Sequence, residues 1–563
     1  MFIPTSKQEI NKLGWHKLDI ILVSGDAYID VPYDGVAVIG KVLINAGYKV
    51  GIISQPALNS HEDIMRLGEP DLFWGISAGC TDSMVANYTA LKKRKRNDDL
   101  TPGGINNKRP DRALLAYTNL IRRFFKNTKP IILGGIEASL RRIAHYDYWD
   151  DKIRRSILFD SKADAIVYGM GEKTILEIAE CLKTFSDFRS TRGICYISNS
   201  PNNDYLLLPS FEEVQNDDKK FIEMFHTFYK NNDPLNAKGL YQQHGTRYLI
   251  QNPPNYFLAT EELDKVNEIG FERDVHPYYK KQGKVKALET IQFSVNSHRG
   301  CFGECNFCSI TVHQGRTVIS RSIESIKNEI KEITKHKDFK GIISDVGGPT
   351  ANMYDMTCEI QSSKGSCKNK RCIAQKSCDK LIINHEPQIE LLKELSTIPG
   401  IKKIFIGSGI RYDLVMEDSE SGIKFLSQIV DKHVSGQLKI APEHIDDSIL
   451  KLMGKPPSKH LKNFKDKFYE LSKVKNKKQF LTYYFIAAHP GCDIDNMKSL
   501  NYFVKNELKL SPEQVQIFTP TPSTYSTLMY YTGLNPFTNE QIFVEKDSHK
   551  KEIQKKLISG KNN

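Results

Sequence analysis

Short apolar runs alternate with amphipathic stretches along most of the chain. In the first part, apolar runs of strand length cover residues 19–24, 49–54, 72–77, 130–134 and 163–169. Each run ends in small or polar residues, and helical stretches lie between the runs. Strands that are apolar throughout are typical of a parallel sheet buried on both faces. The pattern therefore predicts an α/β domain over residues 1–200, with a doubly wound parallel sheet.

The alternation weakens after residue 200 and resumes near residue 286. Polar stretches and prolines 253, 254 and 277 suggest that residues 201–285 are a linking segment. Beyond it, amphipathic helices are expected at 322–335 and 388–396. Six strands are expected between and around them, at residues 291–296, 341–346, 403–406, 438–440, 480–486 and 515–518. Residues 286–530 are therefore predicted to form a partial six-stranded β/α, TIM-like barrel, followed by a short basic tail over 531–563.

The carboxyl end of nearly every predicted barrel strand carries polar or special residues. These ends include residues 345–350, 407–413, 441–444, 488–491 and 519–522. Barrel enzymes build their active sites from loops on that face. The pattern favours catalysis by the second domain.

Three cysteines follow the first predicted barrel strand with the spacing CxxxCxxC. Cys301, Cys305 and Cys308 can close on one face of a compact metal cluster. A four-iron cluster held by three thiolates leaves one iron with an open position, where chemistry can occur. The alternative is a zinc site, for which His313 is the nearby fourth ligand.

A second group of cysteines lies in an insertion at residues 350–385. It comprises Cys358, Cys367, Cys372 and Cys378. Four thiols in so short a stretch can hold an iron-sulfur cluster or zinc, and the spacing does not separate these two metals. The alternative is four free thiols in a mobile lid.

Composition limits the compartment and the partners. The 563 residues include eleven cysteines, and no apolar run occurs in the first twenty residues that would indicate a signal peptide or membrane anchor. We expect a cytoplasmic protein with no membrane partner. The net charge of +12 and the basic run Lys92–Arg96 could bind RNA, but Asp98 and Asp99 follow that run and lysines are spread through the chain.

The cysteine loop, with Phe307 before its last cysteine, resembles the cluster loop of the radical S-adenosylmethionine (SAM) enzymes. More of the chain is similar to the YgiQ-type radical SAM family, whose own reaction is uncharacterised. The similar runs are Asp111-Arg112, Leu133–Trp149, Gln251–Pro254, His313–Arg316 and Phe518–Thr527. The resemblance implies a 4Fe-4S cluster and SAM as cofactors, and a 5'-deoxyadenosyl radical as the reactive species.

The same resemblance assigns a SAM pocket to the barrel strand ends. It implies that Gly347 and Gly348 hold the SAM amino group and that Phe307 lies near the adenine. Polar contacts to the ribose and carboxylate fall to Ser408, Arg411 and Glu443. Further contacts to SAM or substrate are expected from His313, Arg316, Glu443 and His489, whose alternative role is to form hydrogen bonds on the barrel rim. No side chain is assigned a catalytic role.

The amino-terminal domain resembles cobalamin-binding domains, which carry an Asp-x-His-x-x-Gly signature. This chain keeps Asp30 and Gly35 but has Pro32 where the cobalt-binding histidine would stand. The sequence argues against a histidine-ligated cobalamin, whereas a corrin bound without that ligand stays open.

These observations favour a radical SAM enzyme that acts on an unknown substrate and takes electrons from a donor such as flavodoxin or ferredoxin. A non-catalytic iron-sulfur redox or sensor protein is the first alternative, and an RNA-modifying or RNA-binding protein is the second. Methylthiolation of tRNA is disfavoured, because the first cysteine is Cys80 and those enzymes carry cluster cysteines in their amino-terminal domain.

Overall fold

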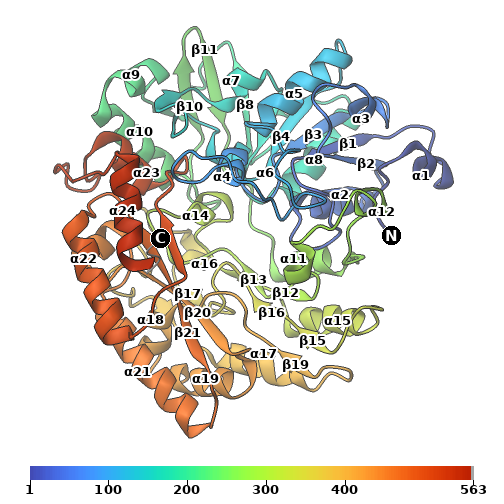
Figure 1. The fold of residues 1–563 in the computed structure, drawn as a ribbon. Helices are drawn as coiled ribbons and strands as arrows, with labels where there is room; N and C mark the ends of the chain where they lie inside the picture. The colour runs from blue at the N-terminus through green and yellow to red at the C-terminus, as the bar shows by residue number, and fades with distance from the viewer. Residues whose placement is uncertain (560–563) are drawn as a thin grey trace. The chain divides into compact units, whose positions relative to one another are not determined.

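The computed structural model describes residues 1–559, which divide into two compact units (Figure 1). The first unit contains residues 1–258, 265–292 and 521–523. The second contains residues 259–264, 293–520 and the described residues from Thr524 to Ser559. Helix α11 (Thr260–Glu268) is therefore shared between the two units.

A mixed sheet forms the centre of the first unit, with strand order β2-β1-β3-β4-β7-β8-β11-β10-β9. The strands from β2 to β7 are parallel, as the sequence predicts. They are β1 (Ile20–Ser24), β2 (Val50–Ser54), β3 (Phe73–Ser77), β4 (Ile131–Gly134) and β7 (Ala165–Val167). The chain moves from β1 to β2 on one side and then returns to β3 on the other, which is the doubly wound arrangement.

The predicted linking segment differs in the structure. Strands β8 (Ile194–Ser198), β9 (Leu206–Leu208), β10 (Leu240–His244) and β11 (Arg247–Gln251) extend the same sheet. Antiparallel pairing joins β7 to β8, β8 to β11 and β11 to β10. Much of the 201–285 segment is therefore part of the first unit's core rather than a connection between two domains, and the sheet is mixed rather than parallel throughout.

Helices and a short hairpin surround this sheet. The core combines fully buried strand residues such as Ile20 and Ile52 with helix residues such as Ile178. The remaining elements are α1 (Lys7–Lys12), α2 (Gly35–Asn45), α3 (Glu62–Met65), α4 (Ser83–Asn87), α5 (Ala113–Phe124), α6 (Gly135–Leu140), β5 (His145–Asp147), β6 (Lys152–Arg154), α7 (Ile157–Ser161), α8 (Glu172–Lys183), α9 (Phe211–Asn216), α10 (Asp218–Lys230), α12 (Pro277–Lys280) and α13 (Leu288–Ile291).

The second unit pairs short parallel strands in chain order. Strand β12 (Ser294–Asn296) pairs with β16 (Asp345–Gly347), and β15 (Ile342–Ile343) pairs with β19 (Lys403–Ile404). A parallel bridge between Ile410 and Ile440 leads to β20 (Gln437–Glu443), β21 (Phe480–Ala487) and β22 (Gln514–Ile517). All six predicted strand regions contain strand residues. The first strand is shorter than predicted, because Leu288–Ile291 is helical.

Helices and two short antiparallel pairs complete the second unit. The short pairs are β13 (His298–Arg299) with β14 (Ile319–Ser320) and β17 (Thr357–Cys358) with β18 (Leu381–Ile382). The helices are α14 (Ile310–His313), α15 (Ile323–Thr334), α16 (Gln361–Lys364), α17 (Glu386–Ser396), α18 (Tyr412–Glu417), α19 (Gly422–Gln428), α20 (Asp447–Met453), α21 (Lys459–Val474), α22 (Ile494–Phe503), α23 (Tyr525–Thr532) and α24 (Ser548–Ser559).

The predicted basic tail contains a packed helix, α24. Within α24, Ile558 belongs to the core of the second unit, and the Gln554 Oε1 atom accepts a hydrogen bond from Ala488 N at 2.9 Å. Residues 560–563 lie outside the described part of the chain. Lys550 and Lys556 of this helix are exposed, whereas Lys551 lies on its buried face and donates to the Tyr530 hydroxyl.

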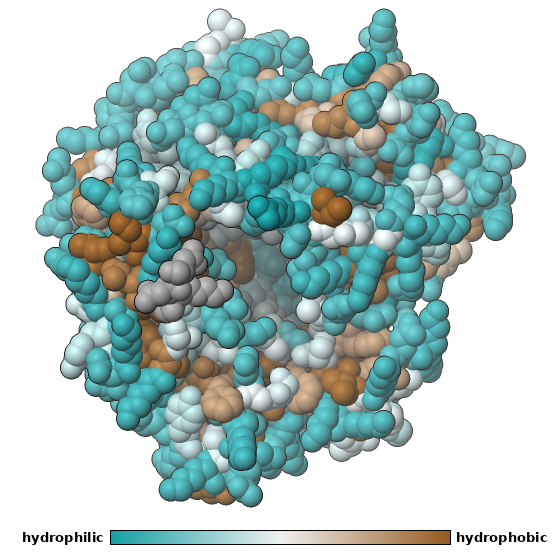
Figure 2. Space-filling model, in the orientation of Figure 1, coloured by the Kyte–Doolittle hydropathy of each residue, from teal (hydrophilic) through white to brown (hydrophobic). Residues whose placement is uncertain are grey.

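The molecular surface in Figure 2 is mainly hydrophilic, with scattered apolar residues. Within residues 1–559, the structure contains no helix that combines the length and the apolar character needed to span a membrane.

Candidate metal centre and cofactor pocket

The three motif cysteines lie on a buried loop that follows β12. Phe302 and Glu304 on this loop are almost inaccessible to solvent, and the cysteines are half-buried. The backbone of Cys308 donates to Cys305 O at 3.0 Å, and Gly303 N donates to the Cys301 Sγ atom at 3.3 Å. The chain therefore turns tightly around its own sulfur atoms.

Gly300 permits this turn. Its φ angle is +81°, and a Cβ atom there would lie 1.9 Å from Thr317 O. Only glycine adopts this backbone conformation without strain and without that clash. The backbone at Thr317, just before β14, therefore packs directly against Gly300, the residue that precedes Cys301.

Burial and mutual charge disfavour the free thiolates. Burial raises the pKa of the Cys301 thiol, and burial together with the neighbouring Cys305 raises the pKa of Cys308 to about 12. Because metals bind the thiolate, binding here must release protons. Within residues 1–559, no three His, Cys, Asp or Glu side chains stand at the spacing of ligands to a single ion. In a cluster, the cysteines bind through different irons.

Arg411 brings a positive charge to these sulfurs. Its Nη1 atom lies 3.9 Å from Cys305 Sγ, and the guanidinium is held by Asp413 through hydrogen bonds of 2.8 and 2.6 Å. Its backbone N donates to Asn352 Oδ1 at 2.7 Å. Arg411, which was predicted to contact SAM, thus lies beside a cysteine sulfur. This position suits a side chain that contacts a ligand bound next to a cluster.

The glycine pair stands beside the cysteine loop. Gly347 ends β16, and a Cβ on Gly348 would lie 2.5 Å from the His298 ring, so this position must be small. Ser408 is engaged elsewhere, because its hydroxyl donates to Asp345 in a short hydrogen bond. Phe307 is half-buried, with its ring 6.4 Å from that of His489. The structure thus leaves the glycine backbone, rather than the Ser408 hydroxyl, as the better candidate for contact with a ligand.

Glu443 ends β20 in a strained conformation with φ at +66°. Burial raises the pKa of this carboxyl, while Lys455, with Nζ 3.9 Å away, opposes the rise. Left-handed backbone at a non-glycine residue is concentrated at functional sites. The negative charge of Glu443 also raises the pKa of Cys308, which places the carboxylate near the cysteine loop.

Two of the other predicted contacts have structural partners. Arg316 Nε lies 2.7 Å from Glu304 Oε1, and its Nη2 donates to the carbonyls of Cys367 and Lys370. His489 is fully buried between Pro490 O and the Ser526 hydroxyl, and burial lowers its pKa to about 3. Both are better assigned to holding loops than to binding substrate. His313 ends α14 and is half-buried.

A buried polar chain behind Arg411 was not predicted. The Asn352 amide donates to Arg411 O at 3.0 Å and lies 3.1 Å from His385 Nε2. On the other side of the ring, His385 Nδ1 is 2.7 Å from Asp418 Oδ2. These three residues are too far apart in the sequence for their contacts to be predicted from it. The one available signal was the position of Asn352, four residues after the Gly347–Gly348 pair.

The carboxyl edge of the first unit contains a different set of contacts. Asp26, after β1, forms a close ion pair with Arg109, and Arg109 Nη1 lies 3.0 Å from Asp98 Oδ2. Cys80 N donates to the same Asp26 carboxylate at 2.6 Å. The Asp26 carboxylate at the switch point between β1 and β3, where ligands of doubly wound sheets bind, is therefore engaged by the chain's own groups.

The residues at the positions of the cobalamin-binding signature likewise have partners within the chain. Asp30 pairs with the Lys41 ammonium at 3.0 Å and accepts from the Tyr28 hydroxyl, while Pro32 is buried and offers no ligand to cobalt. An antiparallel bridge between Ile29 and Val275 covers this segment. The residues present do not fit a histidine-ligated corrin.

The basic run 92–96 is partly used within the first unit. Arg94 Nη1 lies 3.1 Å from Asp111 Oδ1, and Lys95 Nζ donates to Val85 O. Lys92 lies over the Tyr148 ring at 4.7 Å. These cations have intramolecular partners, which weakens the argument for an RNA-binding surface.

Relatives share the whole length of the chain. Residues 2–294 match the family described as Radical SAM N-terminal, and residues 513–562 match a domain of unknown function, DUF3362. UPF0313 protein FN0734 of Fusobacterium nucleatum is 56% identical over 561 residues, covering 100% of this chain and 99% of its own. A UPF0313 protein of Thermotoga maritima is 49% identical over 549 residues, covering 97% and 96%.

A solved structure shares the fold. The radical S-adenosylmethionine methyltransferase TsrM from Kitasatospora setae, solved with cobalamin and a 4Fe-4S cluster bound, has a TM-score of 0.51 at 12% identity. The match covers 90% of this chain and 73% of that one. At this identity the likeness shows the fold alone. The sequence relatives go further, and by them the chain belongs to the UPF0313 family, the YgiQ-type radical SAM enzymes.

Proposed function

We propose that Cys301, Cys305 and Cys308 hold a 4Fe-4S cluster at which SAM is cleaved to act on a substrate still to be identified. The observation that carries this proposal is the buried loop after β12. It gathers the three thiols beside the Arg411 guanidinium and the Gly347–Gly348 strand end. Soft thiolates are the ligands that iron-sulfur clusters take in proteins.

When bound, the cluster supplies the electron that cleaves SAM to methionine and a 5'-deoxyadenosyl radical. The side chains prepare the site in three ways. The three cysteines leave one iron open. Arg411 brings a buried positive charge next to the cysteine sulfurs and would balance a ligand carboxylate. The end of β16 would offer the backbone groups of Gly347 and Gly348, which carry no side chain of their own, while the His298 ring packs against the Cα of Gly348.

The proposal also implies a reducing setting and an electron donor. Eleven cysteines in this chain argue for metal sites and free thiols rather than disulfides. We assign the protein to the cytoplasm and expect a small reducing donor of the flavodoxin or ferredoxin type.

The test is anaerobic turnover of SAM. The purified chain is reconstituted with iron and sulfide, mixed with dithionite and SAM, and assayed for 5'-deoxyadenosine. The wild type should form it, and the C301A/C305A/C308A variant should form none above background. A Cys181→Ala variant is the matched control, because Cys181 lies on α8 in the first unit.

Two outcomes would point to the alternatives. A fully loaded cluster that gives no deoxyadenosine, and whose electron paramagnetic resonance (EPR) signal does not change on adding SAM, would contradict SAM cleavage and favour a redox or sensor protein. Tight RNA binding that weakens steeply with salt would favour the RNA-binding alternative.

A further inference from the structure

The insertion of residues 350–385 brings three thiols together. In the two-residue ladder of β17 and β18, Cys358 is opposite Leu381. Leu381 N in turn donates to Cys378 O at 2.9 Å. Cys358 and Cys378, twenty positions apart in the sequence, therefore lie on neighbouring backbone.

A tight turn adds the third thiol. Cys378 N donates to Cys372 O at 2.8 Å, and an antiparallel bridge joins Ile373 to Ser377. Cys372 and Cys378 stand at the two ends of this turn. Cys358 and Cys372 belong to one buried cluster, and Cys378 packs against it. The three side chains thus share one place.

That place is apolar and contains a hydrogen-bond donor aimed at sulfur. Cys358 and Cys372 are buried with Met353, Met356 and Leu381. Gln361 is itself 3% exposed, and its Nε2 atom lies 3.4 Å from Cys372 Sγ. Amide donors to sulfur accompany thiolates that bind metals, because they stabilise the anionic ligand.

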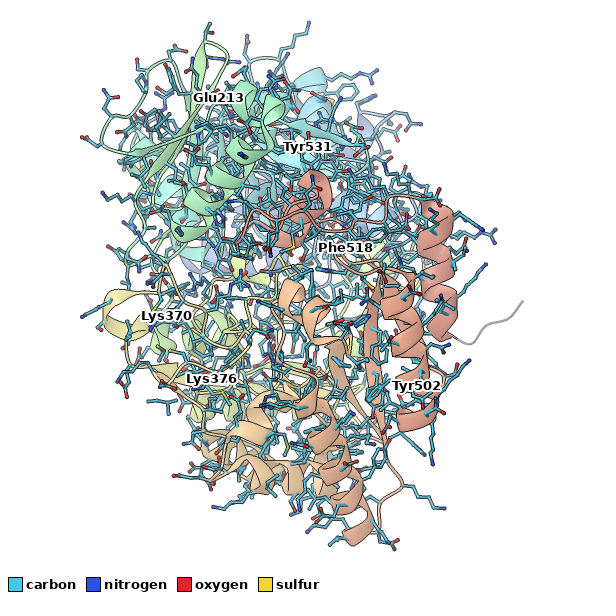
Figure 3. All side chains as sticks on the ribbon, turned by 90° about the vertical axis from the view of Figure 1, so that its left-hand side faces the viewer. Glu213, Lys370, Lys376, Tyr502, Phe518 and Tyr531 are labelled. Atoms are coloured by element: carbon cyan, nitrogen blue, oxygen red, sulfur yellow. The ribbon has the colours of Figure 1, made fainter. Side chains whose placement is uncertain are left out.

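The insertion contains little regular secondary structure. Its described regular structure consists of α16, with four residues, and the two-residue strands β17 and β18. Lys370 and Lys376 are exposed on its loops (Figure 3). Small loop-rich segments of this kind commonly depend on a metal or a disulfide. Free thiols packed as small apolar groups would not supply that constraint.

Cys367 is the available fourth thiol. Its carbonyl accepts from the buried Arg316, which also holds Glu304 of the first cysteine loop. Arg371 Nη1 donates to Glu304 O at 3.2 Å, and Arg411 Nη2 donates to Ile373 O at 3.1 Å. Three arginines therefore tie the insertion to the first loop.

We propose that Cys358, Cys372 and Cys378 bind a second metal centre, with Cys367 as its fourth thiolate. Within the described residues no three such side chains stand at the spacing of ligands to a single ion, so the arrangement favours an iron-sulfur cluster, whose irons bind the thiolates separately, over zinc. The centre fixes the insertion against the loop that carries Cys301, Cys305 and Cys308. The assignment does not depend on SAM cleavage.

The test measures metal in a chain that lacks the first centre. The full-length C301A/C305A/C308A variant, purified anaerobically, should retain about four irons with sulfide per chain. Adding C358A/C372A/C378A should remove that iron. Absence of stoichiometric iron from the folded C301A/C305A/C308A variant, with or without zinc in its place, would overturn the proposal.

A labelling experiment covers the case in which the sixfold variant does not fold. In the C301A/C305A/C308A variant, a thiol-alkylating reagent should leave Cys358, Cys372 and Cys378 unmodified, and a chelator should expose them. Labelling of Cys181 should be the same in both states. Equal labelling of the three thiols with and without the chelator would contradict the proposal.

The fourth ligand is tested separately. Cys367→Ala, made in the same C301A/C305A/C308A background, should make the metal labile to a chelator that leaves the parent variant loaded. Unchanged retention would remove Cys367 from the site.

Discussion

The two units treat the carboxyl ends of their parallel strands differently. In the first unit, the polar group after β1 is satisfied within the chain, since Asp26 and Asp98 enclose the Arg109 guanidinium. In the second unit, the loop after β12 presents sulfur atoms whose partners are weak. They are an amide N–H, the Thr350 hydroxyl 3.5 Å from Cys301, and a guanidinium 3.9 Å from Cys305.

The difference teaches that polar residues at strand ends do not by themselves mark a site. Both units have glycines and charged groups there, as the sequence shows. What separates them is whether each buried polar group already has a strong partner. A closed network of ion pairs stabilises a fold, whereas buried thiols beside a fixed positive charge are suited to bind a metal.

Removing the charge of Arg109 in the first unit should have the largest effect on stability. Arg109→Met leaves Asp26 and Asp98 buried without their counter-charge, and we expect a loss of about 3–5 kcal/mol in the free energy of unfolding. The three tryptophans, residues 15, 74 and 149, all lie in the first unit, so their fluorescence in urea reports on that unit.

The matched control also removes the two negative charges that Arg109 compensates. In D26N/R109M/D98N the carboxylates are neutral, and most of the lost stability should return. Cluster absorbance, which belongs to the second unit, should be unchanged in both variants. Stability of the single variant equal to the wild type would show that the pair contributes nothing.

The pH dependence of the same edge should be the next largest effect. Burial and the nearby Asp26 raise the pKa of Asp34 to about 7. In the unfolded state this carboxyl has its ordinary pKa near 4 and loses its proton above that pH, whereas in the folded state it keeps the proton up to about pH 7. Stability therefore falls as the pH rises from about 4 to about 7. Between pH 5 and 8 we expect this group to lower stability by about 3 kcal/mol.

Asp34→Asn isolates this contribution. The amide oxygen can still accept from Val36 N at the start of α2, but the side chain no longer titrates. Urea unfolding followed by tryptophan fluorescence should show a flatter pH profile for the variant. The same slope in both proteins would assign the dependence to other groups.

The parallel strands could be predicted because their chemistry is uniform. The residues of β1 and β2 are all buried, so their apolar runs appear unbroken in the sequence. Strand β10 was missed because Gln242 is one of its buried residues. Its side chain bonds to Ala144 N and Pro209 O, which lie far away in sequence. A polar residue in a core is explained only by partners that the local pattern does not contain.

The candidate site divides in the same way. The three cysteines were predictable because their spacing is itself the signal. The partners of Arg411 were not, since Asn352 and Ile373 approach it from segments 59 and 38 positions away. The partner of Ser408 was hidden for a related reason, because the sequence gives no sign that Asp345 accepts from its hydroxyl.

Arg411→Gln tests whether the guanidinium beside Cys305 acts on the proposed cluster. Removing a positive charge beside the sulfurs disfavours the extra electron of a reduced cluster, so the reduction potential should become more negative. We expect a shift on the order of 60 mV, a tenfold change for one electron. EPR-monitored redox titration measures it, and Arg411→Lys should show a smaller shift. An unchanged potential in a fully loaded Gln variant would mean that the guanidinium does not act on the cluster.

The smallest effect is expected on the exposed turn between Cys372 and Cys378. The Lys376 ammonium lies 3.8 Å from Asp379, and both side chains are more than four-fifths exposed, at 85% and 89%. Lys376→Ala should therefore change the free energy of unfolding by less than about 0.5 kcal/mol. Metal content should equal that of the wild type, whereas Cys372→Ala, four positions earlier, should reduce it. Loss of metal in the lysine variant would show that the turn's conformation, rather than its thiols, decides whether the insertion is occupied.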